Sequence, residues 1–459
     1  MGPFAGPPRG LSAPVVGNGT VFPRRRPPPL FFPMQVSWKR NFYTLWATQL
    51  VAIIGFQAIQ PFLPYYIQEF DVKDLNEALI WAGHMGTAAG LAMAFSSPVW
   101  GALADRFGRK SMVVRAMLGG GVTVVLMAYV TTLTQLLVAR FLQGVLAGTV
   151  AACITLVSTT TPRQHLGYAL GLMQGAVMLG GSLGPLVGGP FIERFGYQSC
   201  FVVSGVLVAV AGVAVQLWVR EDFRREPGTE SPLTGTAGFL SDSVRLLRLR
   251  PFLLMLVSLT LIQFAFGVTM PVVPLFLQTL AQTDNIVALA GRVFSVAGLV
   301  GALSSAILGR WSDWVGARRT LLIGLLTNTL FVVLQGLSTS VTMLAALMVL
   351  ASISGGAIRP VANAIIARIV PDEDRGKAFG LLTSANAFGW ALGPAVGGYV
   401  GAELGFRTAF FVTAALFLGV TAWVWRAIRQ VPLEEPAIGR ARSALWGRQV
   451  RAEVGDGQE

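Results

Sequence analysis

Long apolar runs recur along the whole chain, and short polar connections separate them. A helix needs about 20 apolar residues to cross a hydrocarbon layer of roughly 30 Å. Runs of that length form two groups of six, at 42–66, 79–100, 112–130, 133–156, 167–192 and 198–219, then at 252–278, 287–309, 318–337, 341–367, 376–401 and 407–428. The pattern therefore predicts an all-α polytopic membrane protein with twelve transmembrane helices.

The charges in the connections predict how these helices are oriented. Lys and Arg concentrate in the cytoplasmic loops of membrane proteins. Here the basic residues fall in alternate connections, including Lys39, Arg40, Arg106, Arg109, Lys110, Arg310, Arg318, Arg319, Arg368 and Arg375. The connections between them, such as TTLTQ and QTDN, are acidic or uncharged. We therefore expect both termini in the cytoplasm and a multi-pass protein of the plasma membrane, the inner membrane of a bacterium.

Changes of composition divide the chain into five parts. Residues 1–37 are rich in Pro and Arg, and we expect this extension to be disordered. A six-helix bundle over 38–220 and a second one over 251–428 follow, joined by a polar cytoplasmic loop at 221–250. The polar tail 429–459 is expected to be cytoplasmic.

The two bundles are copies of one another. Residues 162–189 and 371–398 are identical at 13 of 28 positions without a gap. The pair Pro61 and Pro64 recurs as Pro271 and Pro274, 210 positions later. Repeats of this parallel kind are related by an axis along the membrane normal, and the substrate site lies at their interface near mid-membrane. The sequence therefore predicts two six-helix repeats around a central site.

Composition excludes several classes of function. The chain is 53% hydrophobic and only 12% charged. Soluble domains carry about 25% charged residues. The net charge of +13 is explained by cytoplasmic loops, so we expect no nucleic-acid partner. Two Cys and two His lie far apart in the sequence, which argues against a metal site, and no cofactor is expected. The absence of a GxxxxGK[ST] loop argues against ATP drive, and the absence of clustered acids argues against an enzyme.

Three motifs resemble those of a known family. GALADRFGRK at 101–110, LVARFLQGVLAG at 137–148 and GPLVGG at 184–189 resemble signatures of the major facilitator superfamily. The overall pattern is most similar to its twelve-span bacterial drug:proton antiporters. The resemblance implies the major facilitator fold and export of small amphipathic compounds by alternating access, in exchange for protons. We expect a monomer in the lipid bilayer.

The first motif is expected to act as a latch. By resemblance, this loop holds the two halves together in the outward-facing state, with Asp105 as a charge-assisted acceptor and Arg115 within its reach. An ordinary cytoplasmic turn would also explain Arg109 and Lys110, but it would not explain the copy that contains Asp313. The predicted latch comprises Gly101, Asp105, Arg106, Gly108, Arg109, Lys110, Arg115 and Asp313.

Glycine and proline interrupt one predicted helix of each repeat. Small residues four apart let helices approach closely, and a proline allows a bend. The first copy is by resemblance an antiporter mark, but its duplication makes it first a packing device between the halves. Trp390 replaces Gly181 in the second copy. The motif residues are Gly184, Pro185, Gly188 and Gly189, and then Gly393, Pro394, Gly397 and Gly398.

Polar residues within the spans are the candidate substrate ligands. An arginine at mid-span costs about 2.5–3.5 kcal/mol on insertion scales, so it should face a cavity or a partner. Arg140 could instead snorkel to the membrane edge, and the glutamines could join packed helices. Arg359 could favour an anionic substrate group or pair with backbone carbonyls. The predicted cavity comprises Gln57, Gln60, Arg140, Gln143, Met178, Arg359, Asn363, Asn386 and Trp390.

No acidic residue falls in the middle of a predicted span. Proton coupling therefore has two candidates: His84, because histidine is the side-chain type best suited to a proton switch, and Asp105 at a helix end. A packing role for His84 is equally compatible with the sequence.

The main alternative function keeps the fold and changes the cargo to a specific metabolite or organic anion. A membrane enzyme or a non-transporting receptor fits the sequence less well.

Overall fold

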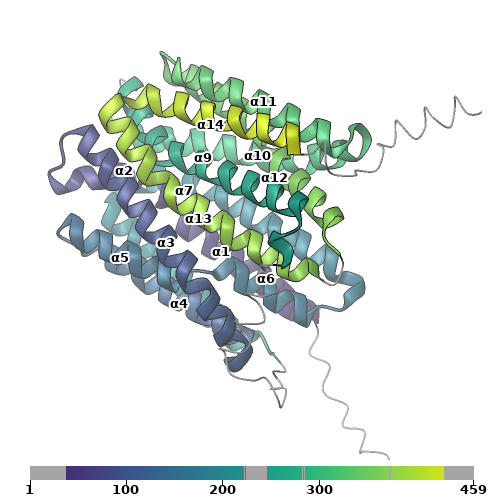
Figure 1. The fold of residues 1–459 in the computed structure, drawn as a ribbon. Helices are drawn as coiled ribbons and strands as arrows, with labels where there is room; N and C mark the ends of the chain where they lie inside the picture. The colour runs from purple at the N-terminus through teal and green to yellow at the C-terminus, as the bar shows by residue number, and fades with distance from the viewer. Residues whose placement is uncertain are drawn as a thin grey trace, which may run out of the picture. The chain divides into compact units, whose positions relative to one another are not determined.

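A computed structural model describes residues 38–221, 223, 245–281, 283, 285–371 and 374–427. The predicted N-terminal extension, most of the 221–250 loop and the C-terminal tail lie outside these residues. The described part of the chain is helical and contains no strand. Figure 1 shows the helices and their labels.

Each repeat forms a bundle of long helices. The first bundle contains α1 (Trp38–Gln57), α2 (Leu63–Ile67), α3 (Leu75–Phe107), α4 (Arg109–Met127), α5 (Leu133–Leu146), α6 (Thr149–Thr160) and α7 (Leu166–Trp218). The second contains α9 (Arg250–Leu280), α10 (Ile286–Val315), α11 (Ala317–Gly336), α12 (Val341–Ile369), α13 (Arg375–Leu404) and α14 (Phe406–Ala427).

The predicted count of twelve crossings is confirmed over the described residues. Ten helical segments are long and apolar enough to span a membrane. One of them, the 53-residue α7, is long enough for two crossings and therefore counts twice. This helix turns at Gly196, so both of its arms lie beside α1: Gly180 contacts Ile53, and Val208 contacts Gly55. The glycine-rich α13 supplies the remaining crossing, packed between α3 and α9.

Four tight turns between spans depend on glycine. Gly108, Gly196, Gly316 and Gly405 have φ angles of 88°, 78°, 99° and 89°. A side chain is strained in this region of backbone conformation. Gly108 and Gly316 occupy equivalent places in the two repeats, as do Gly196 and Gly405. The repeat therefore extends to the backbone conformation of its turns.

The first repeat departs from the prediction in two of its spans. The runs 42–66 and 133–156 were expected to be single helices, but the first breaks after Gln57 and the second breaks at Ala147 and Gly148. Pro61 cannot donate an intrahelical hydrogen bond, but its equivalent Pro271 lies inside a continuous helix, so the proline alone does not account for the first break. Gly148 adopts a φ of 114°. The equivalent helices α9 and α12 continue unbroken, so the two halves are not identical.

Side chains satisfy the carbonyl groups at the second break. Trp100 Nε1 donates to the Val145 carbonyl at 2.6 Å, and Arg115 Nη1 donates to the Leu146 carbonyl at 3.2 Å. The Arg115 guanidinium lies 3.7 Å from the centre of the Trp100 ring. The last carbonyls of a helix need such partners when the helix stops inside the protein. Arg115 therefore supports the break in the fourth span.

Two seams of small residues join the halves. One seam pairs α3 with α13, which run side by side, and the other pairs α7 with α10. A Cβ on Gly83 would lie 2.6 Å from the Pro394 carbonyl oxygen, and one on Gly189 would lie 2.7 Å from that of Val287. Side chains larger than hydrogen would therefore separate the two bundles.

The glycine–proline motifs also hold each bundle together. Gly184 and Gly188 press on Gln57 and Ala58 at the end of α1 and in the break that follows it, while Gly393 and Gly397 press on Gly267 and Val268 of α9. Gly398 adds a contact to the Leu79 carbonyl across the α3 seam. One face of each motif thus packs inside its own repeat, and the adjacent face of the same helix packs against the other repeat.

We predict that Gly188→Val destabilises the protein by about 1–3 kcal/mol, because the new side chain would overlap the Ala58 backbone. The midpoint of thermal unfolding in detergent measures this effect. Gly175→Val is the matched control: it lies on the same helix and meets nothing within 4 Å. The change of helix propensity is the same at both positions. Equal losses in the two variants would contradict the packing account.

Candidate functional site

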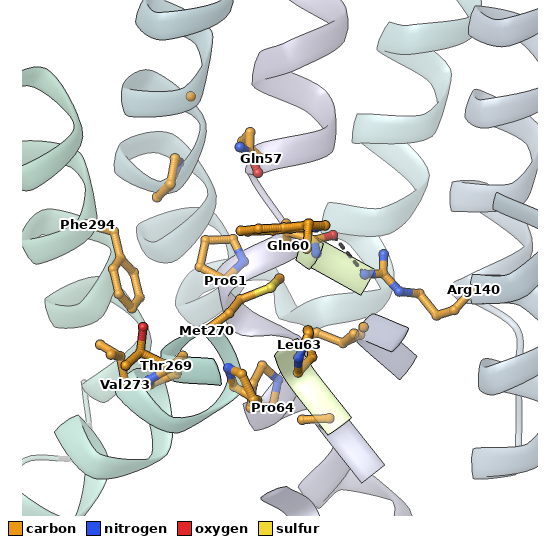
Figure 2. Close-up of a pocket in the computed structure, with 18 of the residues that line it drawn as sticks. Gln57, Gln60, Pro61, Leu63, Pro64, Arg140, Thr269, Met270, Val273 and Phe294 are labelled. Carbon is orange, nitrogen blue, oxygen red and sulfur yellow. Dashed lines mark hydrogen bonds between the residues drawn. The ribbon is translucent and has the colours of Figure 1, made fainter. Parts of the chain in front are cut away.

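Two adjoining cavities lie between the bundles. The first, which we name the inner chamber, has a volume of about 290 Å³. Figure 2 shows this chamber, with Phe294 and Arg140 toward its two sides and Gln57, Gln60 and Met270 between them. The second, which we name the vestibule, has a volume of about 630 Å³ and is lined by Phe56, Met93, Ser97, Gln143, Thr149, Thr155, Thr383, Ser384 and neighbouring residues.

Among the described residues that line the two cavities, Arg140 is the one that carries a charge. It is 4% exposed and lies in the middle of α5. Its Nη1 donates to Gln143 Oε1 at 2.6 Å and its Nη2 donates to Gln60 Oε1 at 2.9 Å, while its Nε has no acceptor among the described residues. Neutral amide oxygens thus replace the carboxylate partner that a buried arginine commonly has.

Six prolines form much of the wall of the inner chamber. They are three repeat-related pairs: Pro61 with Pro271, Pro64 with Pro274, and Pro185 with Pro394. A proline ring is apolar, and it fixes its own backbone φ angle. The chamber is therefore a stiff apolar space whose polar side chains are those of Gln57, Gln60, Arg140 and Thr269.

Polar links between the halves close one end of the inner chamber. Tyr65 donates through its hydroxyl to the Pro274 carbonyl at 2.7 Å. The amides of Gln68 and Gln278 donate to each other's oxygens, both at 3.0 Å, across 210 positions of sequence. At the same end of the bundles, Glu193 Oε1 accepts the Ala288 backbone N–H at 2.7 Å. We name this set the closed end.

The vestibule extends toward the opposite end, where the basic loops lie. Its wall follows α3 from Gly86 to Ser97 and α6 from Thr149 to Thr155. The break at Gly148 also lines it. Backbone outside a helix is tolerated at membrane depth only when it is buried in protein or lines a water-filled space. The vestibule thus explains why the fourth span can break there.

The structure gathers five of the predicted cavity residues at the two cavities: Gln57, Gln60, Arg140, Gln143 and Trp390. The other four line neither. Arg359 Nε donates to Gln263 Oε1 at 3.0 Å, and Asn363 is exposed one turn further along α12. Met178 lies partly buried on α7. The Asn386 Oδ1 is buried without a donor among the described residues.

His84 lies on a seam and lines neither cavity. Its Nε2 is 2.9 Å from the Tyr399 hydroxyl of α13, and its ring also meets Trp81 edge-on. The contact joins the two halves through α3 and α13. Any proton transfer between His84 and Arg140 would therefore be indirect.

A residue from another segment, Glu221, holds the predicted latch loop. Its carboxylate accepts the backbone N–H groups of Arg109 at 3.0 Å and Lys110 at 2.8 Å, the first residues of α4. A carboxylate is favourable at a helix N-terminus because of the unpaired N–H groups and the helix dipole. Lys110 Nζ donates to the Gln216 carbonyl at 2.8 Å. The Asp105 side chain lies outside the described atoms, and Asp313 is exposed.

Sequence reasoning missed Glu221, the closed end and the proline wall. The Gln68–Gln278 pair and the prolines share the 209–210-residue repeat spacing, so that spacing was an available signal. Glu221 carried no signal, because it comes from the segment after α7 and its role depends on the fold.

Comparisons with known proteins agree with this architecture. The sequence model of the Major Facilitator Superfamily matches residues 45–316 and 255–452. Multidrug resistance protein MdtG of Dickeya zeae is 31% identical over 399 residues, covering 86% of this chain and 96% of the relative. MdtG of Yersinia enterocolitica is 30% identical and covers 88% and 96%.

Solved structures share the fold at lower identity. A bacterial homologue of the human lysosomal transporter Spinster, in an inward-facing and unoccupied conformation, has a TM-score of 0.70 at 17% identity, covering 87% of this chain and 99% of that one. The human organic anion transporter MFSD10 has a TM-score of 0.62 at 18% identity, covering 84% and 99%. With its two repeats, its seams and its central cavities, this chain belongs to the Major Facilitator Superfamily.

Proposed function

We propose that this protein exports small amphipathic organic compounds in exchange for protons, by alternating access. The observation that carries the proposal is a pair of cavities between two bundles that are joined by small-residue seams and closed at one end. Rocking of two such repeats about a central site is the general mechanism of this architecture. The multidrug resistance relatives, which are 31% and 30% identical over most of the chain, support drug-like cargo.

The lining of the cavities favours varied cargo over one tightly specified ligand. Most of the contact surface is apolar: prolines, Met270, Phe294, Met348 and Trp390. Side chains of this kind bind by shape and area, and methionine adapts to different partners. The amide groups of Gln57 and Gln60 can donate or accept hydrogen bonds, so they suit many polar substituents.

The direction of export follows from the proposed orientation. With the basic loops in the cytoplasm of a bacterial cell, both termini are cytoplasmic and the vestibule opens to the cytoplasm. The structure then represents the state that takes up cargo from inside, with the closed end toward the outside. The partners in this proposal are the cargo, protons and the lipid bilayer, and the protein works as a monomer without catalysing a reaction.

The proton carriers in this proposal are His84 and Asp105. His84 lies at a seam that has to move when the halves rock, so its protonation can alter the contact with Tyr399. Asp105 stands at the end of α3, beside the turn at Gly108 that Glu221 holds. Both are close to moving parts, and neither needs to touch the cargo.

A specific metabolite or an organic anion is the second candidate cargo. Within the described part of the chain, Arg140 is the lone charge in the cavity lining, and no described carboxylate accompanies it there. A buried cation without a counter-ion attracts negative groups. An anionic cargo would therefore meet no described negative charge that repels it in either cavity.

We predict that Arg140→Ala lowers export at least about tenfold at unchanged protein abundance. The change removes the charge and leaves the Gln60 and Gln143 oxygens without their donor. The measurement is the decrease in fluorescence of a lipophilic dye, Hoechst 33342, in inverted vesicles after a pH gradient is imposed.

Arg292→Ala serves as the matched control, because Arg292 is an exposed arginine of α10 that lines neither cavity. It should export at the rate of the unchanged protein. Export without any response to the pH gradient would contradict proton exchange. Full activity of Arg140→Ala would contradict the placement of cargo beside this arginine. Transport of organic anions in the absence of dye transport would favour the second candidate cargo.

A further inference from the structure

The inner chamber and the vestibule adjoin, and they share part of their lining among the described residues. Five residues line both cavities: Gln60, Gly86, Arg140, Met270 and Trp390. Gly86 contributes no side chain, and Gln60 is held to Arg140 by a hydrogen bond at 2.9 Å. The two large side chains of the second half at this boundary are therefore Met270 and Trp390. We name these five residues the neck.

Trp390 breaks the symmetry of the repeats at the neck. Its equivalent in the first half is Gly181, 209 positions earlier, which also lines the inner chamber. A Cβ placed on Gly181 would approach nothing closer than 3.9 Å, so this side of the chamber is open. On the opposite side an indole occupies the corresponding place. The backbone pattern does not require a large residue there, because the first repeat has the same motif without one.

The cavities on the two sides of the neck differ in chemistry. The inner chamber has the proline wall and a volume of about 290 Å³. The vestibule is about 630 Å³, and five hydroxyl-bearing residues line it: Ser97, Thr149, Thr155, Thr383 and Ser384. Drug-sized ligands occupy pockets of roughly 300–1,000 Å³. The vestibule can therefore hold a whole drug-sized molecule, whereas the inner chamber has only about the volume of the smallest such pockets.

The tryptophan itself suits a place between an apolar and a polar compartment. No described residue accepts a hydrogen bond from its indole N–H, so that donor is free for a ligand. The ring offers a large flat apolar face. Met270 beside it is flexible and can move aside, whereas an indole has only two side-chain torsions and a fixed width.

We propose that Trp390 is a size filter that decides which part of the cargo enters the inner chamber. The cargo binds in two parts: a compact apolar group passes the neck and packs against the prolines, while the bulkier polar part stays among the hydroxyls of the vestibule. The compounds selected are therefore amphipathic molecules with one compact apolar end. This inference rests on the proposed function for its biological meaning, but the filter itself can be tested without transport.

Two single cysteines report access to the two sides of the neck. Thr269→Cys places a thiol in the inner chamber and Thr155→Cys places one in the vestibule, each in a background that carries Cys153→Ala and Cys200→Ala. Inverted vesicles of the full-length protein are treated with N-methylmaleimide, which is compact, or with fluorescein-5-maleimide, which is bulky. Fluorescein is anionic and the neck carries Arg140, so charge does not oppose its entry.

With Trp390 in place, the compact reagent should label both cysteines, and the bulky one should label only that at position 155. Trp390→Ala should raise bulky labelling at position 269 by about tenfold or more, relative to position 155. Trp390→Phe should give a smaller rise. Trp314→Ala is the matched control, because Trp314 is 65% exposed on α10 and lines neither cavity; it should leave the ratio unchanged.

Three results would overturn the inference. They are equal bulky labelling of both positions with Trp390 in place, an unchanged ratio in Trp390→Ala, and failure of the compact reagent to reach position 269. If the unchanged protein does not export the dye, the proposed function is contradicted. The labelling ratios would still decide whether Trp390 filters by size.

Discussion

Direct backbone contact across the seams is the constraint on which the rest of the structure depends. Gly83 and Gly189 bring one bundle against carbonyl groups of the other, and Gly188 and Gly397 do the same within each bundle. In lipid, helices associate through close packing and interhelical hydrogen bonds, because the tails around them are as apolar as their side chains. Smooth seams of small residues also let two packed bodies shift without large side chains having to unlock. The glycine–proline motif therefore serves cohesion in both repeats, and in the proposed transport cycle it would also serve movement.

The cavities lie between the repeats, and their polar lining departs from the twofold symmetry of the repeats. The first half has breaks in its first and fourth spans and carries Arg140, whereas the second half has continuous helices and carries Trp390. Arg140 donates hydrogen bonds to Gln60, which lies beside the first break, and to Gln143 of its own helix. The second break is supported by Trp100 and Arg115, whose donors serve the carbonyls that the helix leaves unpaired. Symmetric packing thus forms the frame, and asymmetric polar chemistry forms the site.

Much of this could be read from the sequence, and the parts that could not have physical reasons. Apolar run length and loop charge are properties of each segment, so the spans and the repeat were predictable. Gln57, Gln60, Arg140, Gln143 and Trp390 were found because a polar or bulky residue stands out within an apolar run. The Arg115 guanidinium lies on Trp100, a contact between different helices that spacing does not reveal. The cap by Glu221 and the break at Gly148 depend likewise on neighbours that only the folded chain brings together.

The central claim is that the closed end must open in every cycle, and cross-linking tests it most directly. Gln68 and Gln278 face each other from the two halves, so Gln68→Cys with Gln278→Cys, in a chain without Cys153 and Cys200, can be joined by a short bifunctional methanethiosulfonate reagent. The account predicts that the cross-link stops dye export and that a reducing agent restores it, while either single cysteine treated in the same way remains active. Undiminished export by the cross-linked protein would contradict alternating access through this end.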